Sequence, residues 1–80
     1  MRVVGEIPHK DCKITIFQWN EKYIVKIEQG NLEQSFKINQ LDLTSEDEVY
    51  EVVNEAFIQN VMNNFNAMHQ IFSKALSEVL

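Results

Sequence analysis

The stretch that decides the fold is residues 12–38, CKITIFQW-NE-KYIVKIEQ-GN-LEQSFKI. Apolar and polar side chains alternate along it, which is the period of β-strands that bury one face. Asn20-Glu21 and Gly30-Asn31 interrupt the alternation where two-residue hairpin turns would, and glycine tolerates the positive φ that such a turn requires at its first central residue. The stretch therefore predicts three antiparallel strands over 12–19, 22–29 and 32–38.

A fourth strand is predicted just upstream, over Arg2–Ile7, followed by the turn residues Pro8–Asp11. With His9-Lys10 as its two-residue loop, all three hairpins agree on one apolar face, which collects Val3, Gly5, Ile7, Cys12, Ile14, Ile16, Tyr23, Val25, Ile27, Leu32, Phe36 and Ile38. A slip of one residue would turn a strand over, so we expect this register to be well specified. It also forms one cross-strand row of alternating charge from Glu6, Lys13 and Glu28.

The second half of the chain predicts one long helix over 45–80. Ser45-Glu-Asp-Glu48 has the form of a capping box, in which serine accepts from the amide of Glu48 while Glu48 reaches back, and neither proline nor glycine follows through Leu80. The predicted class is α+β: a four-stranded antiparallel β-meander (1–39) followed by one long C-terminal helical segment (45–80) packed on one face of the sheet. The whole forms a single domain, 1–80.

This helix is too long for its sheet. Uninterrupted it would span about 50 Å, whereas a strand of this length spans roughly 25 Å. From Val61 the apolar spacing changes to alternating four and three, which is typical of a helix–helix seam. Either the helix bends near Asn63-Asn64 and folds back over Phe17 and Trp19, or a second subunit covers its end.

We favour the second subunit, in a two-fold symmetric homodimer. Its predicted interface lies on the C-terminal helix, with Phe65 and Phe72 near the centre, and consists of Val61, Phe65, Met68, Phe72, Leu76 and Val79.

The other face of the sheet carries aromatic and aliphatic side chains among cations. The candidate binding face consists of Arg2, Phe17, Trp19, Lys22, Ile24, Lys26 and Lys37. Phe17 is expected opposite Ile24, with Arg2 and Lys37 in the same row. Aromatic side chains among cations are suited to stacking bases and contacting phosphates. In the order of its elements, four strands followed by a helix, the chain is similar to the repeat unit of the Whirly and PUR families of single-stranded nucleic-acid binders. The alternative, which we prefer, is a surface that contacts another protein.

Charge and composition favour a protein partner. The net charge of −5 argues against nucleic acid or an anionic membrane as the main partner, because both attract cations. The acids concentrate after residue 40, where Lys74 alone opposes them. The sequence shows neither a signal peptide nor an apolar run of about 18 residues, so we expect a cytoplasmic protein that makes no membrane contact.

Chemistry-bearing residues are few. His9, Asp11 and Cys12 are of metal-binding types, but they share a predicted turn, Cys12 is the only cysteine, and the other histidine is His69. One side of the predicted helix carries an acidic run that is typical of a solvated face: Glu48, Glu51 and Glu55. Phosphate-binding loops, nucleophile elbows and zinc-protease motifs are absent from the sequence. We therefore expect a small interaction domain without metal, cofactor or enzymatic activity, with weak single-strand binding as the alternative function.

Overall fold

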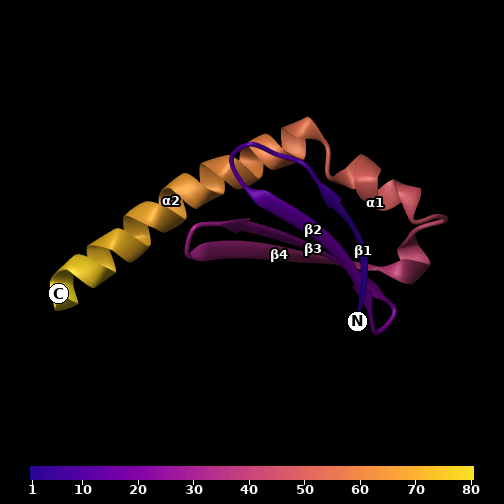
Figure 1. Ribbon diagram of the computed structural model, residues 1–80, viewed down its shortest axis with the longest axis horizontal. Helices are drawn as coiled ribbons and strands as arrows, with labels where there is room; N and C mark the ends of the chain where they lie inside the picture. Colours follow the sequence, from indigo (N-terminus) through magenta and orange to yellow (C-terminus); the bar gives the residue numbers. More distant parts are fainter.

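The computed structural model describes residues 1–80 as one open sheet with helices over one face (Figure 1). The strands β1 (Arg2–Ile7), β2 (Lys13–Trp19), β3 (Lys22–Gln29) and β4 (Leu32–Asn39) pair in the order β1-β2-β3-β4, each antiparallel to the next. A 3-10 turn η1 (Gln40–Asp42), a short helix α1 (Asp47–Val52) and a long helix α2 (Glu55–Val79) follow. The predicted α+β class and β-meander are confirmed.

Turn chemistry fixes the register of β2, β3 and β4. Asn20 and Glu21 both have positive φ, 54° and 63°, as a type I′ turn requires, and Gly30 has φ 59°. The closing pairs are Trp19 with Lys22 and Gln29 with Leu32, so both two-residue loops lie where the sequence places them. The predicted pairing across these two hairpins is therefore correct.

The first hairpin departs from the prediction. Ile7 lies opposite Ile14 rather than Cys12, and a bulge between Val3 and Gly5 shifts the register once more. Glu6 therefore pairs with Thr15, and it does not extend the row formed by Lys13 and Glu28. An extra residue in one strand moves every earlier side chain of that strand to the opposite face of the sheet. Val3 therefore lies on the open face and not on the helix-covered face.

A close approach from α1 accompanies this bulge. A Cβ atom built on Gly5 would overlap the hydroxyl oxygen of Tyr50, so a larger residue here would displace the end of the tyrosine side chain. The contact joins residues far apart in the chain, which is why strand periodicity alone did not reveal it.

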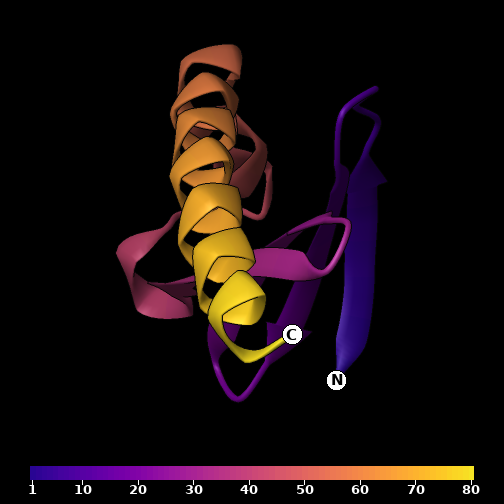
Figure 2. The same ribbon diagram turned by 90° about the vertical axis from the view of Figure 1, so that its left-hand side faces the viewer.

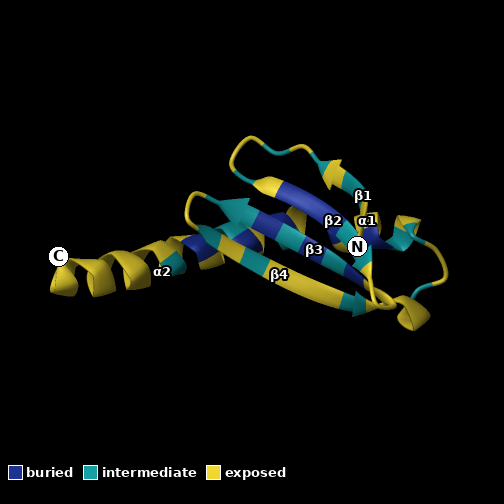
Figure 3. Cartoon of the chain, turned by 60° about the horizontal axis from the view of Figure 1, so that its bottom comes forward, coloured by how far each residue is buried: buried dark blue, intermediate teal, exposed yellow.

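The core lies between the sheet and the helices (Figure 3). The buried apolar residues are Ile14, Ile16, Tyr23, Val25 and Ile27 of the sheet together with Val49, Val53, Ile58, Val61 and Phe65. Phe36, expected in this core, lies at its border and is 37% exposed, with its ring centroid 5.1 Å from that of Phe57 in an edge-to-face arrangement. Each full burial of a side chain of this size stabilises the fold by about 1.5–3 kcal/mol.

The predicted helix breaks once, at Val53-Asn54, and not at Asn63-Asn64. Asn54 is the N-cap of α2: its side-chain oxygen accepts from the amide of Phe57 at 3.0 Å. α2 then continues without interruption to Val79, so the alternative in which the helix bends near Asn63-Asn64 and folds back over Phe17 and Trp19 is wrong. A good capping residue ends one helix and starts the next, whereas an exposed asparagine inside a helix costs only about 0.7 kcal/mol.

The expected capping box also forms differently. Glu48 accepts mainly from the amide and the hydroxyl of Thr44, and the N-cap position of α1 falls on Glu46, which makes no side-chain cap. The hydrogen bonds from the Thr44 hydroxyl and then its amide lower the pKa of the Glu48 carboxyl. Glu48 therefore anchors the segment that leads into α1.

The core assignment predicts opposite outcomes for two neighbouring positions. Val25 is 1% exposed, while Lys26 points to the open face. Val25→Asp should unfold the domain, because an unpaired buried charge costs several kcal/mol against a total stability of about 5–10 kcal/mol. Lys26→Asp should cost about 1 kcal/mol or less. Thermal unfolding followed by circular dichroism measures both, and equal losses would show that the two faces are misassigned.

The helix break predicts a second matched pair. Asn54→Ala should destabilise the domain by about 1 kcal/mol, because the first turn of α2 loses its cap. Asn63→Ala, at an exposed position inside the same helix, should be neutral or slightly stabilising because alanine is the better helix former. Urea unfolding gives both free energies. A larger loss at Asn63 than at Asn54 would contradict the observed boundary.

Candidate interaction surfaces

α2 runs antiparallel to β4 and then leaves the sheet behind. Phe57 packs beside Phe36, the side chain of Gln34 donates to the carbonyl of Val61 at 3.0 Å, and His69 Nε2 lies 2.9 Å from the side-chain oxygen of Gln29. The His69 contact is the last hydrogen bond between α2 and the sheet. Every residue from 71 to 80, which we call the tail, is exposed. Figure 2, seen from the end at which α2 projects, shows these last turns in front of the sheet.

The tail keeps an apolar face although nothing covers it. Its large apolar side chains and their exposed fractions are Ile71 70%, Phe72 43%, Leu76 41%, Val79 84% and Leu80 95%. Phe72 and Val79 follow Phe65 at multiples of seven residues, so they continue the helix face that covers the core. Leu76 lies close to Phe72 and Val79 around the helix, whereas Ile71 and Leu80 flank this face on opposite sides. Together these side chains form an apolar arc over about half of the helix circumference, and such a continuous exposed apolar surface is unusual on a soluble monomer.

Part of the predicted dimer interface is inside the chain's own core. Val61 is 2% exposed, Phe65 is fully buried and Met68 packs against the core, so these three do not offer a surface to a second chain. The prediction started the free segment too early, because α1 takes up the first turns of the expected helix and the sheet then covers α2 as far as His69. Phe72, Leu76 and Val79 stay accessible, and Ile71 and Leu80 join them.

The open sheet face, turned toward the viewer in Figure 3, carries a short apolar row. Val3, Phe17 and Ile24 lie side by side across β1, β2 and β3, and Lys37 of β4 ends the row. Trp19, 54% exposed, lies at the adjacent turn opposite Lys22. Phe17 and Ile24 are half-buried.

This face is less basic than the sequence suggested. The bulge moves Arg2 to the helix-covered side, where its guanidinium donates to Gln18 Oε1 and to Glu46 Oε1, the latter at 2.7 Å. Lys26 stays on the open face with its ammonium 3.9 Å from a carboxylate oxygen of Glu28. The placement of Arg2 on the binding face is therefore wrong, and Val3 takes its place in the row beside Phe17.

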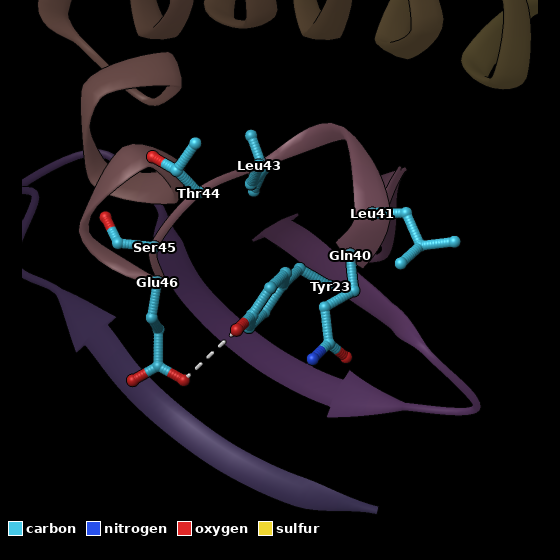
Figure 4. A pocket seen from close by; sticks show the side chains of 7 residues that line it. All are labelled: Tyr23, Gln40, Leu41, Leu43, Thr44, Ser45 and Glu46. Carbon is cyan, nitrogen blue, oxygen red and sulfur yellow. Dashed lines mark hydrogen bonds between the residues drawn. The ribbon is translucent and has the colours of Figure 1, made fainter.

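A hollow of about 300 Å³ lies where β3 meets η1 (Figure 4). The side chains that line it belong to Tyr23, Gln40, Leu41, Leu43, Thr44, Ser45 and Glu46. The Tyr23 hydroxyl donates to Glu46 Oε1 at 3.5 Å, and the same oxygen accepts from Arg2. Leu41 points away from the other side chains and is 93% exposed. These contacts hold the η1–α1 connection onto the sheet, with Glu46 as their common acceptor.

In the loop between β1 and β2, the residues of metal-binding types have structural roles. His9 Nδ1 accepts from the amide of Asp11 at 3.1 Å, which closes the loop between β1 and β2. Cys12 packs against the core, and burial, followed by the nearby Asp11, raises the pKa of its thiol. Nowhere in the chain do three or more histidine, cysteine, aspartate or glutamate side chains come together as a metal site would need.

No family model, curated protein or solved structure matches this chain. The Whirly and PUR resemblance thus consists of element order alone. None of the helices combines the length and the apolar composition needed to cross a lipid bilayer.

The open face predicts a shallow salt dependence for any single-strand binding. With Lys13, Lys22 and Lys37 as its unpaired cations, log affinity should fall with log salt at a slope of about −2.1, or roughly twentyfold between 50 and 200 mM. Fluorescence anisotropy of a labelled oligonucleotide, with Trp19→Ala as the control, measures it. Tight binding with a slope steeper than about −3.5 that Trp19→Ala abolishes would assign this face to nucleic acid.

Proposed function

We propose that this chain is a small, non-catalytic interaction domain that acts as a homodimer, in which a second copy covers the tail of α2. The observation that carries the proposal is the apolar face of the tail, residues 71–80, which projects past the sheet with nothing of its own chain beneath it. Water-exposed apolar area of this size on a rigid helix is typical of a protein–protein contact.

The apolar face of the tail suits a dimer contact. In a dimer each tail removes Phe72, Leu76 and Val79 from water, and the contact can extend to Ile71 or Leu80 at the border of this face. Within 71–80 the charged side chains are Lys74 and Glu78, one of each sign, so the tail itself carries no net charge that would repel a second copy. The acids that give the chain its net charge of −5 lie mostly before the tail.

The open sheet face supplies a second contact surface in this proposal, for a partner protein. An apolar row, Val3, Phe17 and Ile24, with an exposed tryptophan and lysines at its border, has the composition of an interface core inside a charged rim. Single-strand binding, the alternative function, draws its support from Trp19 beside Lys22. Two features oppose it: Arg2 lies on the other face, and the net charge is −5.

A substitution in the tail tests the dimer. The wild-type chain should have a mass in solution of about twice the 9.4 kDa of one chain. Phe72→Glu should weaken dimerisation by about a hundredfold, because each chain places a charge in a shared apolar contact. Gln70→Glu adds the same charge at an exposed polar position and should leave the mass unchanged. Sedimentation equilibrium gives the dissociation constants.

Two outcomes count against the proposal. A wild-type chain that stays monomeric at roughly 100 μM would remove the homodimer, since a dimer weaker than that has a free energy of association smaller than about 5.5 kcal/mol. A dimer that Phe72→Glu leaves as tight as the wild type would mean that the tail is not part of it.

A further inference from the structure

The sheet has two edges, and only one of them is open to pairing. β1 carries the bulge between Val3 and Gly5, which disrupts the ladder that another strand would need. β4 is a regular strand of eight residues, Leu32–Asn39, without proline or bulge. Figure 3 shows it along the front of the sheet with no segment beyond it. β4 is thus the edge at which a further strand can add.

The backbone groups that face this free edge can be identified. Gln40 N donates to Glu21 O at 3.0 Å beside the pair Lys22 and Asn39, which marks that pair as one without its own hydrogen bonds. The two kinds of pair alternate along an antiparallel ladder, so the even-numbered residues of β4 bond to β3. The N–H and C=O groups that point away from β3 belong to Glu33, Ser35 and Lys37.

We propose that β4 pairs antiparallel with β4 of a second copy about a two-fold axis at Ser35, which joins the two four-stranded sheets into one continuous sheet. This inference rests on the proposed homodimer and names the strand that joins its two chains. The partner is a second copy because the sequence of β4 is complementary to itself when reversed, as the side chains around Ser35 show.

Charge selects this register. Centred on Ser35, the pairing places Glu33 of each chain opposite Lys37 of the other, so two opposite-charge pairs form. Centring on Glu33 or on Lys37 would place like charges opposite each other. Centring on Gln34 or Phe36 would leave both charged side chains without an opposite partner. The Ser35 register also matches residues whose outward N–H and C=O groups face one another, as an antiparallel ladder requires.

The helix-covered side of the strand fits the same register. There Leu32 of one chain comes opposite Ile38 of the other, and Phe36, 37% exposed at the free edge, comes opposite Gln34. Apolar side chains therefore meet on the side of the cores, while the charged pairs lie on the open face. A strand with β-branched and aromatic residues placed in this way gains from cross-strand contacts as well as from backbone hydrogen bonds.

The pairing also places the tail. α2 runs antiparallel to β4, so the tail leaves each chain at its Leu32 end. In the antiparallel pair that end lies beside the Ile38 end of the other chain, where η1 follows. The tail of one copy and the exposed Leu41 of the other then share one end of the dimer. A single two-fold axis thus serves both the tail and the strand edge, with the tails at the two ends rather than at the axis.

Exchanging the two charges tests the register. Glu33→Lys alone and Lys37→Glu alone each create two like-charge pairs across the axis and should weaken dimerisation about tenfold or more. The double variant Glu33→Lys/Lys37→Glu restores both opposite-charge pairs and should return to within about threefold of the wild type. Both charged positions are exposed, so monomer folding is the matched control, measured by urea unfolding at low concentration.

Cysteine cross-linking gives an independent readout. In a background with Cys12→Ser, Ser35→Cys should form a disulfide-linked dimer on mild oxidation, because paired residues on an antiparallel ladder have Cα atoms about 5.5 Å apart. Lys37→Cys is the control, since its two copies would lie roughly 13 Å apart along the ladder, beyond the reach of a disulfide.

The outcomes separate this inference from the proposed function. A dimer that Phe72→Glu weakens, but that the double charge exchange does not rescue and Ser35→Cys does not link faster than Lys37→Cys, would overturn β4 pairing and leave the tail contact standing. If Phe72→Glu leaves the dimer unchanged, while the double charge exchange restores dimerisation and Ser35→Cys forms the disulfide, β4 pairing is supported and the tail contact is excluded. A monomeric wild type would overturn both.

Discussion

The packing of α2 onto the sheet ends at His69, and this end point determines which apolar side chains of the helix remain exposed. Up to this residue the helix is held by Val61 and Phe65 in the core and by hydrogen bonds with Gln34 and Gln29. Beyond it the same helix face continues into water. A strand of about eight residues supports roughly 25 Å of helix, and α2 is longer than that. The free tail is therefore a consequence of two lengths, and the chain alone has no means of covering it.

A second constraint comes from one extra residue in β1. Because the bulge at Val4 turns over the start of the strand, Arg2 joins Glu46 on the helix side and Val3 joins Phe17 on the open side. The open face consequently loses a cation and gains an aliphatic side chain. A face suited to phosphates becomes one better suited to the apolar core of a protein interface. The same bulge makes β1 a poor edge, which leaves β4 as the strand open to pairing.

Most of the sheet could be predicted from sequence because its turns are local. Asn20-Glu21 and Gly30-Asn31 set two registers, and each strand between them shows its buried face. The bulge could not be predicted in the same way, since it accompanies the packing of Tyr50 against Gly5 from a distant element. The helix break does have a signal in the sequence, because Asn54 followed by Glu55 is a good start for a helix. Asn63-Asn64 looked like a break only because asparagine is a weak helix former.

The missed boundary between α1 and α2 also affected the predicted site. The prediction took 45–80 as one long helix whose end a second subunit covers, and so it assigned Val61 and Phe65 to a dimer contact, whereas the sheet reaches them once α1 is separate. Phe72, Leu76 and Val79 remain candidates for the dimer contact, because the apolar repeat continues past the end of the sheet. Periodicity thus identified the correct helix face and could not tell which part of it the chain itself covers.

Amide hydrogen exchange at two protein concentrations tests the central claim most directly, because it reports on the tail and on β4 in the unmodified chain. At a concentration above the dissociation constant, the outward amides of Ser35 and Lys37 and the amides of the tail should exchange more slowly than at a hundredfold lower concentration. Exchange in β1 should not change. If the rates in β4 and in the tail are the same at both concentrations while the mass remains that of one chain, a second copy covers neither surface, and the account is wrong.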